Sequence, residues 1–266
     1  MAILNVAIQG ATGRVGREIV SAVCNHPKMQ VAGTVSLDAD GSPLALPNEL
    51  GTVPHTLDFP SLLREIKPDV VVDFSQAEAA LATARCAIDN GVHVVIGTSG
   101  LTGEQVSELD GLCREHGVGG VIAPNFALGA VLMIHMSKIA SKYFDYAEVI
   151  ERHHETKIDA PSGTAIATAE EMVKAKGKPF MLSATEKVNL AGSRGAEVDG
   201  VAVHSLRPQG SVAHQEVIFG GLGQTLTIRH DTSGRLCYMP GVLMALEAAP
   251  KQVGVVYGLD ALLGLD

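Results

Sequence analysis

Short apolar runs alternate with longer mixed segments through the first 125 residues of this 266-residue chain. Each run is continuous and rich in valine or isoleucine, which is typical of a strand buried on both faces of a parallel sheet. The segments between the runs are long enough for the helices that connect parallel strands. The runs are ILNVAI near the N-terminus, VAGTVS (31–36), DVVVDF (69–74), VHVVIG (92–97) and VGGVIA (118–123). This pattern predicts an α/β domain with a doubly wound parallel sheet.

The second half of the chain has a different pattern. Residues 201–230 contain three strand-like runs, VAVHSLR, HQEVIF and QTLTIRH, separated by short segments with glycine. Strands that short turns join pair in antiparallel fashion, so we expect an α+β domain with a mainly antiparallel, open sheet. Helical patterns extend over roughly 128–142, 164–176 and 240–249. We place a first domain at 1–125, completed by 234–266, and a second domain at 126–233.

Composition and charge exclude several classes of protein. Acidic residues outnumber basic ones 29 to 20, a net charge of −9, which argues against a nucleic-acid-binding surface. The uncharged stretch 117–137 is interrupted by Pro124-Asn125 and several glycines, so we expect no membrane span. The N-terminus reads as a first strand and lacks the features of a signal peptide. The four cysteines show neither paired nor metal-ligand spacing, which indicates a cytoplasmic chain with no metal site.

A glycine-rich loop follows the first predicted strand. The segment GATGRVGRE places Gly10, Gly13 and Gly16 in the spacing G-x-x-G-x-x-G, between a strand and a helix. In dinucleotide-binding folds such glycines permit a tight turn, close approach of the backbone to a pyrophosphate, and packing of the helix on the sheet. The unpaired N–H groups at the helix start bind the phosphates. We therefore expect a Rossmann-like domain that binds NADPH, NADH or both.

Other strand ends contribute to the predicted cofactor site. Ser36 ends the second run, at the position where an acidic residue commonly contacts the ribose of NAD, and Asp38 follows it. Arg14 and Arg17 lie close enough in the sequence to meet a 2′-phosphate, so the preference between the two cofactors stays open. The loops GTSG (97–100) and APNF (123–126) follow the fourth and fifth runs. Ligands of doubly wound sheets bind at these carboxyl ends of strands.

The segment ERHHETKIDAPSGTA, residues 151–165, carries an unusual density of chemically active groups. His153 and His154 bring two imidazoles, the groups that proteins most often use to transfer protons, and Lys157 adds a positive charge three residues beyond. Residues 162–164 (SGT) precede a predicted helix, whose free N–H groups favour anions. This combination is suited to a small dicarboxylate substrate that must receive a proton as well as a hydride.

These motifs resemble those of the 4-hydroxy-tetrahydrodipicolinate reductase (dihydrodipicolinate reductase) family. The resemblance rests on GATGRVGRE, VVVDFS, VIGTSG, APNFALG and above all E-x-HH-x-x-K-x-DAPSGTA, and it extends over essentially the whole chain. It implies NAD(P)H-dependent reduction of 4-hydroxy-tetrahydrodipicolinate to tetrahydrodipicolinate, in diaminopimelate and lysine biosynthesis. It also implies that the second domain binds the substrate and assembles a homotetramer.

The resemblance assigns roles to individual residues. His153 is expected to be the general acid, and Lys157 a second proton donor and carboxylate partner. The residues expected to hold the substrate are His154, Gly163 and Thr164. Beside Ser36, the residues expected to contact the cofactor are Gly10, Ala11, Thr12, Gly13, Arg14, Val15, Gly97, Thr98, Ser99, Ala123, Pro124, Asn125 and Phe126.

Two departures from the enterobacterial form of the family bear on these roles. Ser36-Leu37 replaces an acidic–basic pair at the end of the second strand, which affects cofactor preference, and Glu155-Thr156 replaces an Arg and a His beside the substrate. Two alternative functions also stand. One is another two-domain NAD(P)-dependent dehydrogenase, and the other is a non-catalytic dinucleotide sensor. The His-His-Lys segment disfavours the sensor, which has no use for it.

Overall fold

The computed structural model describes residues 3–265 and divides the chain into two compact units. The first unit contains the residues up to Leu128 together with those from Arg235 onward, and the second unit is Gly129–Gly234. The chain therefore leaves the first unit once and returns to it.

A parallel sheet forms the centre of the first unit. In the described chain it has seven strands, in the order β14-β8-β7-β6-β1-β2-β5, and every pairing is parallel. The strands are β1 (Leu4–Gln9), β2 (Met29–Val35), β5 (His55–Thr56), β6 (Val70–Asp73), β7 (His93–Ile96), β8 (Gly119–Ile122) and β14 (Gly254–Tyr257). The five predicted runs became β1, β2, β6, β7 and β8, and the two edge strands, β5 and β14, were not predicted. A separate ribbon pairs β3 (Leu44–Ala45) with β4 (Thr52–Val53).

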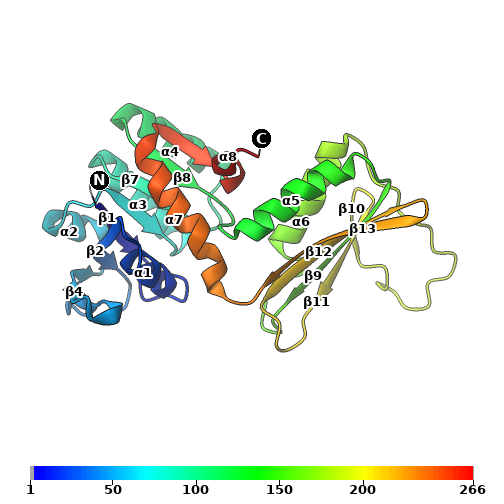
Figure 1. The fold of residues 1–266 in the computed structure, drawn as a ribbon, viewed down its shortest axis with the longest axis horizontal. Helices are drawn as coiled ribbons and strands as arrows, with labels where there is room; N and C mark the ends of the chain where they lie inside the picture. The colour runs from blue at the N-terminus through cyan, green and yellow to red at the C-terminus, as the bar shows by residue number, and fades with distance from the viewer. Residues whose placement is uncertain (1–2, 266) are drawn as a thin grey trace. The chain divides into compact units, whose positions relative to one another are not determined.

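Helices cover both faces of this sheet (Figure 1). One buried cluster joins Val71 and Val94 of the strands to Leu62, Ile88 and Leu109 of α2, α3 and α4, while α1 and α7 pack together elsewhere on the sheet. The α-helices are α1 (Gly16–Cys24), α2 (Phe59–Glu65), α3 (Ala77–Asp89), α4 (Gly103–His116), α7 (Met239–Ala248) and α8 (Leu259–Leu263). Three short 3₁₀ helices are η1 (Pro47–Glu49), η2 (Arg235–Tyr238) and η3 (Ala249–Lys251). The predicted Rossmann-like α/β class is confirmed.

The second unit contains a five-stranded mixed sheet within the described residues. Its order is β10-β11-β9-β12-β13, and only the β9–β11 pair is parallel. The strands are β9 (Tyr146–His153), β10 (Ala196–Val198), β11 (Val201–Leu206), β12 (Ala213–Gly221) and β13 (Gln224–Thr232). The mainly antiparallel character was predicted correctly. The implied neighbour relation was wrong, because β9 inserts between β11 and β12 instead of leaving those consecutive strands paired.

Two helices cover one face of the second sheet. They are α5 (Leu128–Ser141) and α6 (Gly163–Lys176), close to the predicted ranges (Figure 1). Ala169 and Met172 of α6 pack with Val149 of β9, Val217 of β12 and Phe219 of β12 in one buried cluster. Successive side chains of a strand point to opposite faces, so the residues between the clustered ones on β9 and β12 lie on the other face of the sheet. The helix residues of the buried cluster do not cover that face. We call that side the open face.

Candidate active site

The glycine loop joins β1 to α1 in a conformation that needs glycine at two points. Gly10 has a φ of +80°, and a side chain there would also approach the Phe74 carbonyl oxygen at 3.0 Å. A Cβ on Gly16 would overlap the Gly10 carbonyl oxygen, so α1 packs against the loop only because position 16 lacks a side chain. Among the described residues, the N–H groups of Arg14 and Val15 donate no hydrogen bond to the protein. The loop is therefore an open anion cradle at a helix N-terminus.

The end of β2 holds the same loop from the other side. The Thr12 N–H donates to Ser36 Oγ at 3.1 Å, and the Thr12 hydroxyl donates to Asp38 Oδ1 at 2.7 Å. Ser36 is buried beneath the loop, whereas Asp38 is exposed beside it. The hydrogen bond from Thr12 lowers the pKa of the Asp38 carboxyl, so it is ionised at neutral pH. Asp38 is therefore an ionised acidic group beside the glycine loop, and it was absent from the predicted contacts.

The loops after β6, β7 and β8 meet at the carboxyl edge of the sheet. Thr98 Oγ1 donates to Asp73 Oδ1 at 2.7 Å, and the Ser75 N–H donates to the same oxygen at 2.9 Å. The Phe74 and Phe126 rings lie 5.3 Å apart, and Gly97 packs against the Phe74 ring. The structure thus brings the predicted loops 97–99 and 123–126 together.

Asp73 is the buried centre of this junction. Its side chain is 2% exposed, and burial raises the pKa of its carboxyl despite hydrogen bonds from Thr98 and Ser75. Its Oδ2 atom and the Oε1 atom of Gln9 have no hydrogen-bond partner among the described residues. The two residues are register partners on β1 and β6. No cation offsets the Asp73 charge in its hydrogen-bonding set.

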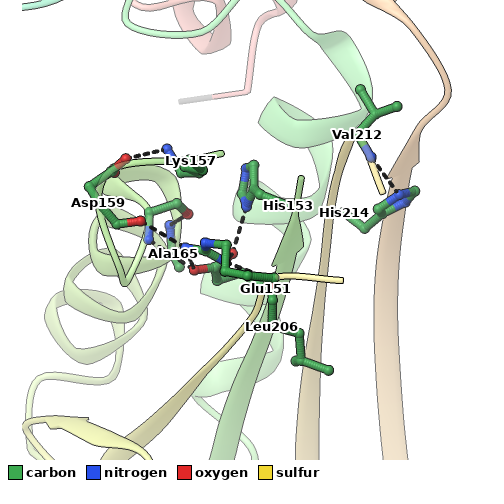
Figure 2. Close-up of polar contacts among 10 residues, drawn as sticks. Glu151, His153, Lys157, Asp159, Ala165, Leu206, Val212 and His214 are labelled. Atoms are coloured by element: carbon green, nitrogen blue, oxygen red, sulfur yellow. Dashed lines mark hydrogen bonds and ion pairs between the residues drawn. The ribbon is translucent and has the colours of Figure 1, made fainter. Parts of the chain in front are cut away.

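In the second unit, β9 ends at the two predicted histidines. The His153 side chain is 17% exposed, and its Nδ1 lies 2.6 Å from Glu151 Oε2 (Figure 2). His154 is exposed and contacts the Thr156 hydroxyl at 2.8 Å. Lys157 lies on the following loop, where its Nζ donates to Asp159 at 2.6 Å (Figure 2). Strand alternation points His153 and His154 to different sides.

The start of α6 is arranged to accept an anion. The Ser162 hydroxyl caps the helix by accepting from the Ala165 N–H at 3.2 Å. Within the described chain, the N–H groups of Gly163 and Thr164 have no protein acceptor. The Ser162 N–H itself donates to Glu151 Oε1 at 3.2 Å, which ties the helix start to the end of β9.

Glu151 links these elements, and sequence reasoning gave it no role. Its side chain is completely buried, and Arg207 donates to both of its oxygens at 2.7 and 2.8 Å. Burial alone would raise the pKa of Glu151, but hydrogen bonds from Arg207, Ser205 and His153 hold it at about 2. An available signal was the spacing of Glu151 and His153, since residues i and i+2 share one face of a strand.

The environment of His153 acts on its pKa in both directions. Burial lowers the pKa of His153 most strongly, and the charges of Lys157 and Arg207 lower it further. The Glu151 carboxylate raises it. The net effect is a pKa below the ordinary histidine value, so a substantial part of His153 is neutral at pH 7.

The fold and these sites define a class of protein. NAD(P)H fits the first unit, because the Gly10–Gly16 turn leaves room and free N–H groups for a pyrophosphate, and the exposed Asp38 lies beside this loop. Across residues 3–265, no three His, Cys, Asp or Glu side chains are grouped to bind a metal. In the same residues, no helix is both long and apolar enough to cross a bilayer. The chain is an NAD(P)H-dependent oxidoreductase.

Comparison with protein families identifies the particular group. The family model "Dihydrodipicolinate reductase, N-terminus" matches residues 4–126, and "Dihydrodipicolinate reductase, C-terminus" matches residues 129–263. The chain belongs to the dihydrodipicolinate reductase family.

Curated relatives agree with this assignment over the full length. The 4-hydroxy-tetrahydrodipicolinate reductase of Moorella thermoacetica is 46% identical over 265 residues, with 99% of both chains covered. That of Dehalococcoides mccartyi is 45% identical over 262 residues, covering 98% of this chain and 99% of the relative.

Solved structures show the same fold. The dipicolinate-bound dihydrodipicolinate reductase from Paenisporosarcina sp. TG-14 has a TM-score of 0.87 at 37% identity and covers 97% of this chain and 99% of that one. An amine dehydrogenase from Mycobacterium smegmatis has a TM-score of 0.64 at 14% identity, covering 95% and 94% of the two chains. The second likeness shows the fold alone.

Proposed function

We propose that this chain reduces 4-hydroxy-tetrahydrodipicolinate to tetrahydrodipicolinate with NADPH or NADH, in the synthesis of diaminopimelate and lysine. One observation supports this most: the segment 151–165 carries His153, Lys157 and the N-terminus of α6 together, in a chain of this family. The predicted alternatives, a dinucleotide sensor or a dehydrogenase of another family, do not account for this segment.

The second unit supplies the contacts for a dicarboxylate. The free N–H groups of Gly163 and Thr164 donate hydrogen bonds to one carboxylate at the positive end of α6. Lys157 and His154 bind the second carboxylate and orient the substrate ring. Arg207 and Arg194 carry positive charges in the same unit, but they are paired with Glu151 and Glu148. Positioning of this kind contributes several kcal/mol to a rate enhancement.

Proton transfer falls to His153. Loss of the substrate hydroxyl as water leaves a conjugated imine, to which bound NAD(P)H supplies a hydride. His153 then protonates the adjacent ring carbon, and Lys157 serves as a second proton donor and holds the neighbouring carboxylate. A well-placed acid of this kind typically contributes about 10²–10⁴-fold.

The first unit supplies the cofactor contacts. The glycine loop from Gly10 to Val15 holds the pyrophosphate, and the loops 97–99 and 123–126 flank the nicotinamide. Asp38 accepts hydrogen bonds from the ribose hydroxyls and disfavours the 2′-phosphate of NADPH by charge repulsion. Arg14 and Arg17 oppose that repulsion, so we expect both cofactors to be used.

The open face of the second sheet is proposed to assemble a homotetramer. It combines the apolar Ile150 and Leu206 with Arg152, His214 and Arg229 around a hollow of about 230 Å³. Arg152 Nε is buried without a partner among the described residues, which leaves a donor for another subunit.

We also propose that the enzyme is cytoplasmic, where Cys24, Cys86 and Cys113 remain thiols.

The direct test follows the loss of reduced-nicotinamide absorbance, with the substrate generated in situ from pyruvate and aspartate semialdehyde by a synthase. We expect substrate-dependent oxidation of both cofactors, and a loss of about 10²–10⁴-fold in kcat for His153→Ala. His116→Ala, which changes a histidine at the end of α4, serves as the control and is expected to retain activity. Tight dinucleotide binding without any oxidation would favour the sensor instead.

A further inference from the structure

We infer that Glu151 is a positioning residue for proton transfer, which fixes the His153 ring so that Nε2 is the atom that carries and delivers the proton. This inference rests on the proposed role of His153 as the acid. It goes beyond that role by naming the reacting atom and the group that controls it.

The contact between the two side chains defines the tautomer. Glu151 Oε2 lies 2.6 Å from His153 Nδ1, and an ionised carboxylate accepts hydrogen bonds but cannot donate them. Nδ1 must therefore carry a hydrogen in both the neutral and the charged ring. The proton that is gained and lost is then on Nε2, at the end of the ring away from Glu151 (Figure 2).

Glu151 stays ionised because its surroundings compensate its charge. Arg207 donates to both carboxylate oxygens, and the Ser162 N–H donates to one of them. Arg207 also donates to the Asp159 carbonyl oxygen at 2.8 Å. Glu151 therefore connects the acid on β9, the substrate-binding start of α6 and the loop that bears Lys157.

The charged groups that face His153 come from several elements. Glu151 on its own strand stabilises the imidazolium, whereas Lys157 on the next loop and Arg207 after β11 oppose it. Asp159 pairs with Lys157 and reduces its effect. Burial also disfavours the charged ring. Among these influences, Glu151 is the one that favours the protonated ring.

A second trio of the same composition differs from this one in burial and in geometry. His204, Arg194 and Glu148 also join one carboxylate to a histidine and an arginine. Glu148, however, has a side chain that is 37% exposed, and His204 contacts it through Nε2. Only the Glu151 trio places a fully buried carboxylate behind a histidine at the end of β9.

The test compares kcat/KM against pH in the wild type, Glu151→Gln and the control Glu108→Gln, which removes a bidentate arginine pair from α4. Activity of an acid catalyst falls as pH rises through its pKa. We expect this fall to move to lower pH by roughly one to three units in Glu151→Gln, with the KM for the cofactor unchanged. The control is expected to match the wild type. An unmoved profile in Glu151→Gln would overturn the inference.

A second measurement needs no variant. NMR of the wild-type enzyme with isotope-labelled histidine reports which ring nitrogen of His153 carries the hydrogen in the neutral form. We expect Nδ1–H, and an Nε2–H tautomer would refute the role of Glu151 even if Glu151→Gln fails to fold. Because this result does not depend on turnover, absence of reductase activity would reject the proposed function separately.

Discussion

Two buried carboxylates in this enzyme have opposite electrostatic surroundings. Glu151 is paired with Arg207, which contributes to holding its pKa at about 2 against the effect of burial. Asp73 has hydroxyl and N–H donors but no cation, so burial raises its pKa. An unpaired buried charge costs free energy in the folded state, whereas a compensated one does not carry the same cost. These two residues should therefore respond in opposite ways to pH.

Asp73→Asn should stabilise the protein at neutral pH. In the unfolded chain Asp73 ionises near its ordinary pKa of 3.8, but in the folded chain it keeps its proton to higher pH. Its contribution to stability is thus present below the unfolded pKa and is lost as pH rises through the folded value. Asparagine also replaces the unpaired carboxylate oxygen by an amide group without charge. We expect a gain of roughly 1–2 kcal/mol in unfolding free energy at pH 7.

Thermal and denaturant unfolding at pH 7 and near pH 3 would measure this effect. The advantage of Asp73→Asn should shrink at the lower pH, where the wild-type carboxyl is mostly protonated in both the folded and the unfolded state. Asp89→Asn, at the exposed end of α3, is the matched control. A difference between Asp73→Asn and wild type that is equal at both pH values would contradict the prediction.

At the scale of elements, the proposed substrate site depends on how one helix begins. Ser162 has extended backbone angles, φ −67° and ψ 147°, and its hydroxyl accepts a hydrogen bond from the Ala165 N–H. The N–H groups of Gly163 and Thr164 are then left for a ligand. Because these donors belong to the backbone, the helix start offers hydrogen bonds to an anion without any charged side chain of its own.

Gly163→Pro should remove one of these donors and keep the helix. Proline is well tolerated at the first helical position, and the extended Ser162 is compatible with a following proline. A hydrogen bond to a charged group contributes about 1.5–3 kcal/mol, so binding of dipicolinate should weaken by roughly 10–100-fold. Isothermal titration calorimetry with dipicolinate and with NADH measures both sites.

Gly163→Ala is the control for this change. A Cβ at position 163 meets no atom within 4 Å, and alanine keeps the N–H group. We expect near wild-type dipicolinate affinity in Gly163→Ala and unchanged NADH affinity in both variants. Equal dipicolinate affinity in the proline and alanine variants would mean that this N–H does not bind the substrate.

At the scale of the whole molecule, the open face of the second sheet is unlike an ordinary solvent face. Ile150 and Leu206 lie on it beside charged side chains, and β13 is a long edge strand. Sheet surfaces of this kind are commonly covered by a partner. Assembly through this face would bury them.

Ile150→Asp should disrupt the proposed tetramer. A carboxylate in the middle of an apolar contact would lose its hydration on assembly, which costs several kcal/mol per subunit interface. Light scattering after gel filtration should give about four times the 27.7 kDa chain mass for the wild type and a smaller mass for the variant. Leu50→Asp, at an exposed leucine of the first unit, should remain tetrameric. A wild-type protein of single-chain mass would refute the assembly.

Much of the first unit could be predicted because its signals are local. The apolar runs of β1, β6 and β7 indicate that each strand is buried, and the spacing of Gly10, Gly13 and Gly16 indicates the turn that follows β1. The same holds for the start of α6, where the cap and the helix lie within a few residues. These features depend on the period and turn chemistry of neighbouring residues.

Tertiary structure alone decided the contacts between distant segments. β9 lies between β11 and β12, and β14 closes the edge of the first sheet from the end of the chain. Glu151 meets Arg207 across 56 residues, and Thr12 meets Asp38 across 26. No periodicity in a sequence records which strands become neighbours, because that choice depends on packing across the whole chain. The chemical groups of the site were therefore visible in the sequence, while their pairing and protonation were set by the fold.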